Sequence, residues 1–458
     1  MPRLPGPSPI SLVRRGLVLF GLILRGARLY GYWFWATHGS RFHRRGEAEW
    51  IERQRAFARA FVDAANRLRG GLIKIGQVAS LRVDVMPDAV TDELARLQDR
   101  VEPHPFHEIA ARVEAELGSP IEERFDRFEP VPLAAASLGQ VHRARATDGR
   151  DLAVKVLYPG IERAVAVDLA MTKLALWLFN FVVIAELMPV YRELRDTLLG
   201  EMDYIQEGRA AEEIGGSLAR EPDLAAHIRV PEIHWDLTSR RVLSMEFLEG
   251  SKINDRAAVA AAGVELDDLV VWVTRAFLHM IFRDGFFHCD PHPGNLMVGS
   301  DGRIGLVDFG MHRRIAPVVL ASVRKNVLAS VLRDSDLYAE SLVDGGMIQA
   351  RDVPAAKAIA ELSFDPAYYN LTPRELTQID FGEYFRRMRS HLKGIRSFCV
   401  PDGLVMCSRA ISLLYGLMAE LAPGIRPLDV LGPYVFEFLA GDAAAKGNGD
   451  VSRASKTV

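Results

Sequence analysis

Two segments in the first half of the chain carry residue types suited to binding a phosphate chain. The first is alanine-rich and lies where a strand–turn–strand would cover phosphates: Ala134-Ala135-Ala136-Ser137-Leu138-Gly139-Gln140-Val141. The second, Ala153-Val154-Lys155, places a lysine inside an apolar strand, where its ammonium needs a partner such as a phosphate oxygen. The chain has nine lysines against 47 arginines, so a lysine at 155 indicates that a compact point charge is needed there. The alternative is an exposed lysine on an edge strand.

Two later segments carry the oxygen-bearing groups that phosphoryl transfer requires. In His288-Cys289-Asp290-Pro291-His292-Pro293-Gly294-Asn295, Asp290 can orient the attacking nucleophile or accept its proton, and Asn295 can hold Mg²⁺. In Val307-Asp308-Phe309-Gly310, Asp308 can bridge Mg²⁺ and the phosphates. A lone Asp-Phe-Gly is a weak signal. Asp290, Asn295 and Asp308, at separations of five and thirteen residues and downstream of an Ala-x-Lys strand, are together a strong one. The alternative, a zinc site built on His288, Asp290 and His292, leaves Lys155 and Asp308 without a role.

Composition excludes several classes of protein. The 458 residues are 49% hydrophobic and 25% charged, which excludes a wholly disordered or collagen-like chain. Three cysteines are too few for a disulfide framework and favour a reducing compartment. The net charge of −3 argues against a generally basic nucleic-acid binder.

This average hides a basic N-terminal segment. Eight arginines against Glu47 and Glu49 give residues 1–50 a charge of +6, which leaves −9 for the remaining 408 residues. Its apolar runs at 16–24 and 29–36 are separated by Arg25 and Arg28, so they do not form the ~20-residue stretch that spans a bilayer. Arginines interleaved with large apolar residues predict a helix in the interface of an anionic membrane. The alternative is an amphipathic helix packed on the protein's own body.

Periodicity and turn signals predict the elements that position these segments. Helices are expected over 47–69, 88–100, 105–117 (stopped by Gly118), 161–219 and 264–284, and over most of the chain from there to about 440. Strands are expected within 137–157 around the turn Thr147-Asp148-Gly149, and at 228–234, 240–247, 295–298 and 303–307. The apolar stretch 174–185 is too short to span a membrane and is expected to be buried or at the lipid boundary.

The predicted domains follow from these elements. They are a basic apolar membrane-interface segment (1–45), a helical extension (46–118), a small lobe containing strands (119–249), a helical lobe (250–440) and a disordered tail (441–458).

Taken together, the motifs resemble the UbiB family of atypical protein-kinase-like proteins, also called aarF-domain kinases. Its alanine-rich loop is matched at 134–141, and its His-x-Asp-Pro-His-Pro-Gly-Asn loop at 288–295. Its Lys-x-Gly-Gln motif is matched by Lys74-Ile75-Gly76-Gln77, followed by Ser80, Arg82, Asp84 and Pro87. Its Glu-x-Asp motif is matched by Glu201-Met202-Asp203, with the kinase-type glutamate at Glu207.

The resemblance implies a role for each of these residues. Glu207 would pair with Lys155 and aim it at the phosphates of ATP, with Asp290 as the catalytic carboxylate and Asn295 and Asp308 as the Mg²⁺ ligands. Lys74 and Gln77 would gate the pocket, with Lys74 facing Glu201 and Asp203. Glu246 and Leu248 would form the hinge that binds adenine. The residues of the alanine-rich loop implied to contact the nucleotide are Ala134, Ala135, Ala136, Ser137, Gly139 and Val141.

The resemblance further implies an α+β, bilobal protein-kinase-like fold with an N-terminal helical extension. It implies an atypical kinase or ATPase that uses ATP and Mg²⁺ and supports ubiquinone biosynthesis, handling membrane lipid, a quinone precursor or partner enzymes of that pathway. The expected location is the cytoplasmic face of a bacterial inner membrane, with the cytoplasm as the alternative, and a homodimer is one alternative for the oligomeric state. The C-terminal helices are more polar than the transmembrane pair of many relatives, so anchoring is expected from residues 10–36 and 168–190. Two other functions stay open: a true small-molecule or protein kinase, and a non-catalytic, nucleotide-gated scaffold that presents lipid.

Overall fold

The protein forms two compact units, each with its own sheet and helices. The computed structural model describes residues 8–38, 45–80, 87–97, 102–180, 188–366, 369–376, 388, 391–392, 394–395, 397–401 and 403–432. The first unit comprises Met1–Gly208 and Glu232–Phe247, and the second comprises Arg209–Pro231 and Leu248–Val458. The predicted domain boundaries stay predictions. The tail 441–458 and residues Arg82 and Asp84 lie outside the described residues.

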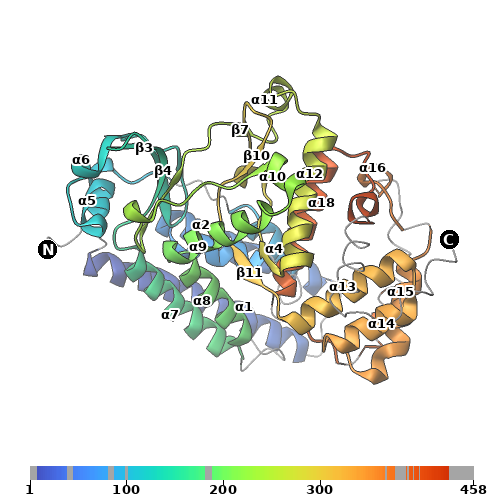
Figure 1. The fold of residues 1–458 in the computed structure, drawn as a ribbon. Coiled ribbons are helices and arrows are strands. Elements are labelled where there is room, and N and C mark those ends of the chain that lie inside the picture. The colour runs from blue at the N-terminus through green and yellow to red at the C-terminus, as the bar shows by residue number, and fades with distance from the viewer. Residues whose placement is uncertain are drawn as a thin grey trace. The chain divides into compact units, whose positions relative to one another are not determined.

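The first unit contains a helical extension, a sheet and the helices that cover it (Figure 1). Its helices are α1 (Pro9–His38), α2 (Arg45–Leu68), α3 (Gly71–Ser80), α4 (Asp88–Leu94), α5 (Phe106–Leu117), α6 (Ile121–Arg124), α7 (Ile161–Asn180), α8 (Met188–Gly200), α9 (Tyr204–Leu218), which begins in this unit, and the 3₁₀ helix η1 (Trp235–Leu237). Its strands are β1 (Phe125–Phe128), β2 (Ala134–Ala135), β3 (Gly139–Ala146), β4 (Asp151–Leu157) and β6 (Val242–Glu246).

The sheet of this unit is antiparallel, in the order β1-β3-β4-β6 with β2 paired to β3. The predicted turn joins β3 and β4, with Gly149 at φ +90°, a conformation that a glycine adopts without strain. Leu152, Val154 and Val156 of β4 are fully buried. Because side chains alternate along a strand, Lys155 lies on the opposite face.

The helices of the extension pack on one another and on α7. Figure 1 shows α1, α7 and α8 side by side, and α1 contacts both α2 and α7. Gly76 of α3 lies so close to Leu97 and Phe61 that a methyl group there would overlap them, at 2.2 and 2.9 Å. The glycine of the Lys-x-Gly-Gln motif is therefore needed for helix packing.

The second unit is mostly helical, with short strands that carry the predicted catalytic segments. Its helices are α10 (Pro222–His227), α11 (Arg256–Ala261), α12 (Leu266–Leu278), the π-helical turn η2 (His279–Asp284), η3 (Pro293–Asn295), α13 (Pro317–Leu332), α14 (Ser335–Asp344), η4 (Ala350–Asp352), α15 (Val353–Ser363), α16 (Pro373–Leu376) and α18 (Leu404–Leu421). Its strands are β5 (Ile228–Arg229), β7 (Ser251–Lys252), β8 (Phe286–His288), β9 (Leu296–Val298), β10 (Ile304–Leu306) and β11 (His312–Arg314). They form a four-stranded sheet, β5-β10-β9-β7, and a pair, β11-β8.

Helix α18 is long and apolar enough to cross a membrane by length and composition, with a mean hydropathy of 1.5. The C-terminal helices are predicted to be too polar for this, and α18 departs from that expectation. In the second unit α18 contacts α12 and buries Met406, Ala410 and Leu417. One such helix is weak support for a membrane span, because core helices of globular proteins meet the same criterion.

The α+β fold class is confirmed, and most local elements lie close to their predictions. Helix α5 spans Phe106–Leu117 and ends at Gly118, which has φ +72°. The region 161–219, predicted to be helical, contains the helices α7, α8 and α9, and residues 181–187 lie outside the described part.

Candidate functional site

Lys155 and Glu207 form an ion pair in the first unit. The Lys155 Nζ lies 2.8 Å from Glu207 Oε1, and the two side chains are 17% and 2% exposed. The same ammonium lies 5.3 Å from the ring centre of the buried Tyr204, which adds a cation–π contact. Glu207 lies in the first turn of α9, where a carboxylate is favoured by the helix dipole. The predicted pair is present, and its action on phosphates stays a prediction.

The alanine-rich loop is a tight hairpin between β2 and β3. The Ala136 N–H donates to the Gly139 carbonyl at 2.8 Å, and Val141 lies opposite Lys155 in the sheet register. A methyl group on Gly139 would lie 2.5 Å from the Val156 carbonyl oxygen, so this position requires a glycine. Ser137 is 1% exposed, and its hydroxyl has no hydrogen-bond partner among the described residues. An orphaned hydroxyl at the tip of this loop fits a phosphate-binding role.

Side chains behind the loop hold it in place. The Tyr158 hydroxyl donates to the Ala136 carbonyl at 3.1 Å, and burial raises the pKa of Tyr158 to about 12. The Gln140 Oε1 accepts from the His104 N–H at 2.9 Å, and the His104 ring stacks on Tyr158 with ring centres 4.1 Å apart. These contacts therefore hold the alanine-rich loop and the side chains behind it in place without a ligand.

His142 extends this network into the core of the unit. It is 0% exposed, with its Nδ1 2.6 Å from the Glu129 carbonyl oxygen and its Nε2 2.8 Å from the Gln140 Nε2. The carbonyl requires a proton on Nδ1 and the Gln140 amide requires a lone pair on Nε2, so the ring is neutral. Burial lowers the pKa of His142 below its ordinary value, although the bond to Glu129 opposes the shift.

We expect His142 to make the unfolding free energy depend on pH. An unfolded chain protonates this histidine near pH ~6.5, whereas the folded protein keeps it neutral to lower pH. The unfolded state then binds more protons, so stability falls as pH drops below ~6.5, by at most about 1.4 kcal/mol per pH unit. Denaturation of wild type and His142→Gln at two pH values measures the slope. The unfolding free energy of His142→Gln should depend less on pH than that of wild type. His107→Gln, a control at an exposed histidine, should keep the wild-type dependence. Equal slopes for wild type and His142→Gln would contradict this role.

The Lys-x-Gly-Gln motif contacts the Glu-x-Asp motif through Glu201, one of the two acidic partners predicted for Lys74. Lys74 Nζ lies 3.2 Å from Glu201 Oε2. Asp203 instead accepts from Arg240 Nη2 at 2.9 Å, and Gln77 donates to the Leu97 carbonyl at 3.4 Å. Lys74 therefore faces Glu201, and Asp203 is tied to the turn that precedes β6. The proposed gating roles of these residues stay predictions.

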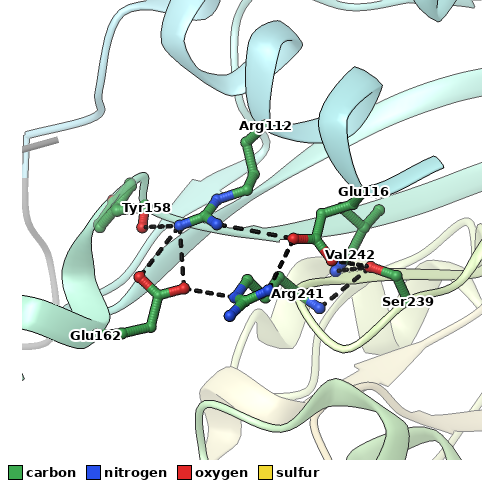
Figure 2. Close-up of polar contacts among 7 residues, drawn as sticks. All are labelled: Arg112, Glu116, Tyr158, Glu162, Ser239, Arg241 and Val242. Carbon is green, nitrogen blue, oxygen red and sulfur yellow. Dashed lines mark hydrogen bonds and ion pairs between the residues drawn. The ribbon is translucent and has the colours of Figure 1, made fainter. Parts of the chain in front are cut away.

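An ionic network anchors this turn to the rest of the first unit (Figure 2). Arg241 Nη1 lies 3.0 Å from Glu116 of α5, and Arg241 Nε also contacts Glu162 of α7. Arg112, which is 3% exposed, contacts Glu162 at 3.2 Å and the Tyr158 carbonyl at 3.1 Å. Arginines and glutamates therefore alternate in this network and pair with one another inside the unit. Since the Arg240 carbonyl accepts from the Tyr204 N–H at 3.0 Å, the same turn fixes the start of α9, three residues before Glu207.

The second unit brings Asp290, Asn295 and Asp308 into one hydrogen-bonded group. Asn295 Nδ2 donates to the Asp290 carbonyl at 3.2 Å and to Asp290 Oδ2 at 3.3 Å. His288 links the two segments, because its Nδ1 accepts from the Asp290 N–H at 2.9 Å while its Nε2 contacts the Asp308 carbonyl. Val307 N–H donates to the Asn295 carbonyl at 3.1 Å, and Asp308 Oδ1 accepts from the Gly310 N–H at 3.0 Å. The three predicted residues therefore gather through their local strands and turns.

The zinc alternative is wrong for this arrangement. Both ring nitrogens of His288 are engaged by backbone groups, and His292 Nδ1 accepts from the Gly294 N–H at 3.0 Å. Within the described ranges, no three His, Cys, Asp or Glu side chains are grouped as a metal site. Cys289 is buried, which raises the pKa of its thiol to about 12, so it stays a neutral core side chain.

The oxygen donors in this group fit Mg²⁺. Asn295 turns its amide nitrogen toward Asp290, which leaves the amide oxygen for another contact, and Asp308 supplies a carboxylate. Mg²⁺ is usually held by one or two protein oxygen ligands together with phosphates and water. Asn295 and Asp308 would therefore be its protein ligands.

Arg409 of α18 is the residue in this group that sequence reasoning missed. Its Nη2 lies 3.1 Å from Asp290 Oδ1, and the two side chains are 21% and 22% exposed. Arg240, Arg241 and Tyr158 were missed in the same way. The chain holds 47 arginines, and no local pattern marks the few that contact the site.

The predicted hinge residues lie on either side of the division between the units. Glu246 ends β6 in the first unit, where its N–H donates to the Glu232 carbonyl at 2.8 Å. Leu248 begins the last segment of the second unit and is 8% exposed. Adenine binding by this segment stays a prediction.

Comparisons with known proteins identify the family. Residues 96–342, more than half of the chain, match the model of the ABC1 atypical kinase-like domain. The chain is 31% identical to the probable protein kinase UbiB of Azotobacter vinelandii, over 79% of this chain and 68% of that protein. It is 32% identical to the chloroplastic Activity of BC1 complex kinase 8 of Arabidopsis thaliana, over 94% of this chain and 60% of that protein. The chain spans about three fifths of the length of several curated relatives.

A solved structure agrees at the level of the fold. It is the complex of Rv3197 with erythromycin from Mycobacterium tuberculosis, with a TM-score of 0.54, 24% identity, and coverage of 82% of this chain and 94% of that one. Sequence motifs, fold and relatives therefore agree that this chain belongs to the ABC1 atypical kinase-like family, which includes the UbiB proteins.

Proposed function

We propose that the protein binds Mg-ATP and hydrolyses it slowly, in support of ubiquinone biosynthesis at the cytoplasmic face of a bacterial inner membrane. Membership of the ABC1 family supports a kinase-like catalytic role. The likeness to a UbiB protein supports the link to quinone synthesis.

The observation that carries the nucleotide part of the proposal is the Lys155–Glu207 pair. Glu207 is almost completely buried, and the Lys155 ammonium faces its carboxylate at 2.8 Å, as a buried charge requires. The pair holds the Lys155 ammonium on the strand next to the alanine-rich loop, where it would contact phosphate oxygens. The orphaned hydroxyl of Ser137 at the loop tip supports the same ligand.

The residues of the second unit would carry out the transfer step. Asp290 orients the attacking hydroxyl, or a water molecule, and accepts its proton. Arg409 and Asn295 hold the two carboxylate oxygens of Asp290, which fixes the direction in which it accepts. Asn295 and Asp308 would hold Mg²⁺, which when bound neutralises charge on the phosphates.

The choice of acceptor depends on the helical extension. In this proposal Lys74 and Glu201 fix the position of α3 within the extension. The extension would exclude a folded protein substrate, so that water or a small molecule receives the phosphoryl group. Membrane lipid, a quinone precursor or a partner enzyme would then respond to the nucleotide state.

One experiment separates this function from its alternatives. Purified full-length protein is assayed for Mg-dependent ATP hydrolysis, with and without anionic vesicles and a quinone-precursor phenol, and for labelled phosphate on added proteins. We expect slow hydrolysis that both additions stimulate, with protein labelling at background. Strong protein labelling would overturn the proposal in favour of a protein kinase, and nucleotide binding without hydrolysis would overturn it in favour of a scaffold.

A further inference from the structure

Helix α1 has an exposed apolar face that the fold of the first unit does not cover. This outer face consists of Ile10, Val13, Leu17, Phe20 and Leu24, which are 81%, 63%, 66%, 45% and 45% exposed. Spacings of three and four residues place all five on one side of the helix. Single exposed apolar residues are common on proteins, but a continuous row of this length marks a contact surface.

The charges on α1 indicate what kind of surface covers this face. The helix has four arginines and no acidic residue. Arg14, Arg25 and Arg28 are exposed, and helical spacing places them along one edge of the outer face. Apolar side chains bordered by arginines fit an anionic lipid surface, where the apolar row enters the acyl boundary and the guanidinium groups meet the headgroups.

Helix α7 adds apolar surface next to α1. Phe179 of α7 packs against Gly26, where a methyl group would lie 2.7 Å from its ring, and its ring centre lies 6.2 Å from that of Tyr30. The neighbouring Trp177 and Leu178 are 51% and 39% exposed. Exposed apolar side chains therefore lie at the end of α7, and α7 packs beside α1 (Figure 1).

The opposite face of α1 is tied to the helix that carries Lys74. Arg15 is 7% exposed and donates to both Asp168 carboxylate oxygens, at 2.5 and 2.6 Å. It also donates to the carbonyls of Leu68 and Arg69, each at 2.7 Å, where α2 ends. One arginine of the basic segment is thus a buried structural residue of the unit.

Asp168 continues this connection to the start of α3. The Leu72 N–H donates to Asp168, and a methyl group on Gly71 would lie 2.9 Å from Asp168 Oδ2. Gly70, with φ +69°, makes the turn between α2 and α3. Lys74 follows two residues after Leu72 and pairs with Glu201. Arg15 and Asp168 therefore join α1 to the first turn of the Lys74 helix.

We propose that the outer face of α1 docks on an anionic lipid surface, and that Arg15 and Asp168 couple this docking to the position of α3. An effect of the coupling on ATP turnover rests on the proposed function. The docking and the response of α3 do not, so both are measured without nucleotide.

Flotation with phosphatidylcholine vesicles, with or without phosphatidylglycerol, tests the docking. The full-length protein should float with the anionic vesicles. Leu17→Glu with Phe20→Glu should reduce binding more than ~10-fold, because two apolar side chains no longer enter the lipid. Leu332→Glu, at a 58% exposed position of α13, is the matched control and should float like wild type. Unchanged flotation of the double variant, or a change of its oligomeric state in solution instead, would overturn the docking.

Hydrogen exchange of the backbone amides in 71–80 tests the coupling. Anionic vesicles should change the exchange rates there in wild type and in Arg67→Gln, a control at the end of α2. Arg15→Gln should still float, because its side chain faces inward, but should lose the vesicle-induced change. Asp168→Asn, which keeps the side-chain volume, should lose it too, and thermal unfolding confirms that each variant is folded. A vesicle-induced change that persists in a folded variant of either residue would overturn the coupling.

Discussion

Replacing Asp290 by Asn is expected to lower the rate of ATP hydrolysis by about 10²- to 10⁴-fold while nucleotide affinity changes little. An amide has nearly the shape of the carboxylate but cannot accept the proton of the attacking water. Asn295 Nδ2 contacts the Asp290 carbonyl, which the substitution leaves in place, and Asp290 Oδ2, which the amide oxygen of an asparagine can replace as acceptor. Single-turnover hydrolysis and equilibrium binding of a fluorescent ATP analogue measure the two effects separately.

Loss of the Arg409 ion pair is the main competing cause of an effect at this position. Asp290 Oδ1 lies 3.1 Å from Arg409 Nη2, so Asp290→Asn also removes a partner of a partly buried guanidinium. Arg409→Gln tests this cause, since it removes the same ion pair but keeps the carboxylate. We expect Arg409→Gln to lower the rate of ATP hydrolysis much less than Asp290→Asn does. Asp301→Asn, whose ion pair with Arg303 is on the surface, is the matched control. Near-normal hydrolysis by Asp290→Asn would contradict its role as proton acceptor.

The sequence predicts those parts of the site that depend on local signals. The hairpin around Gly149 and the end of α5 at Gly118 follow from residues that allow positive φ at one position. Period-two burial of β4 places Lys155 on the face opposite Val154 and Val156. The spacing of the motifs predicts that Asp290, Asn295 and Asp308 lie together, because only short strands and turns separate them in the sequence.

The contacts that hold these parts in place could not be predicted from the sequence. Arg409 is 119 residues from Asp290, and Arg241 is 79 residues from Glu162. Such pairs depend on how helices pack, and any of the 47 arginines could have been assigned to them. Strands β8 and β11 have three residues each, which is too short for an alternating pattern to be recognised. Arg15 shows the same limit, because its sequence neighbours indicate a membrane contact while its side chain is buried against Asp168.

The Lys155–Glu207 pair should show a large and unequal response to mutation of its two members. Lys155→Met leaves a carboxylate that is 2% exposed without its ammonium partner, and it is expected to lower the unfolding free energy by about 3 kcal/mol. Glu207→Gln should cost less, because Lys155 is 17% exposed and its long side chain can reach water. Both variants should lose ATP affinity, because the ammonium is either absent or no longer held toward the phosphates.

A double-mutant cycle separates the pair from the general effect of altering each site. If Lys155→Met is destabilising because it strands Glu207, then Lys155→Met with Glu207→Gln should be more stable than Lys155→Met alone. The coupling energy expected for a contacting buried pair is about 1–3 kcal/mol. Urea denaturation of the four proteins without nucleotide gives this energy independently of catalysis. Additive costs would show that the two charges do not depend on each other, and the Lys155–Glu207 pair would then no longer support the assignment of a phosphate-binding lysine.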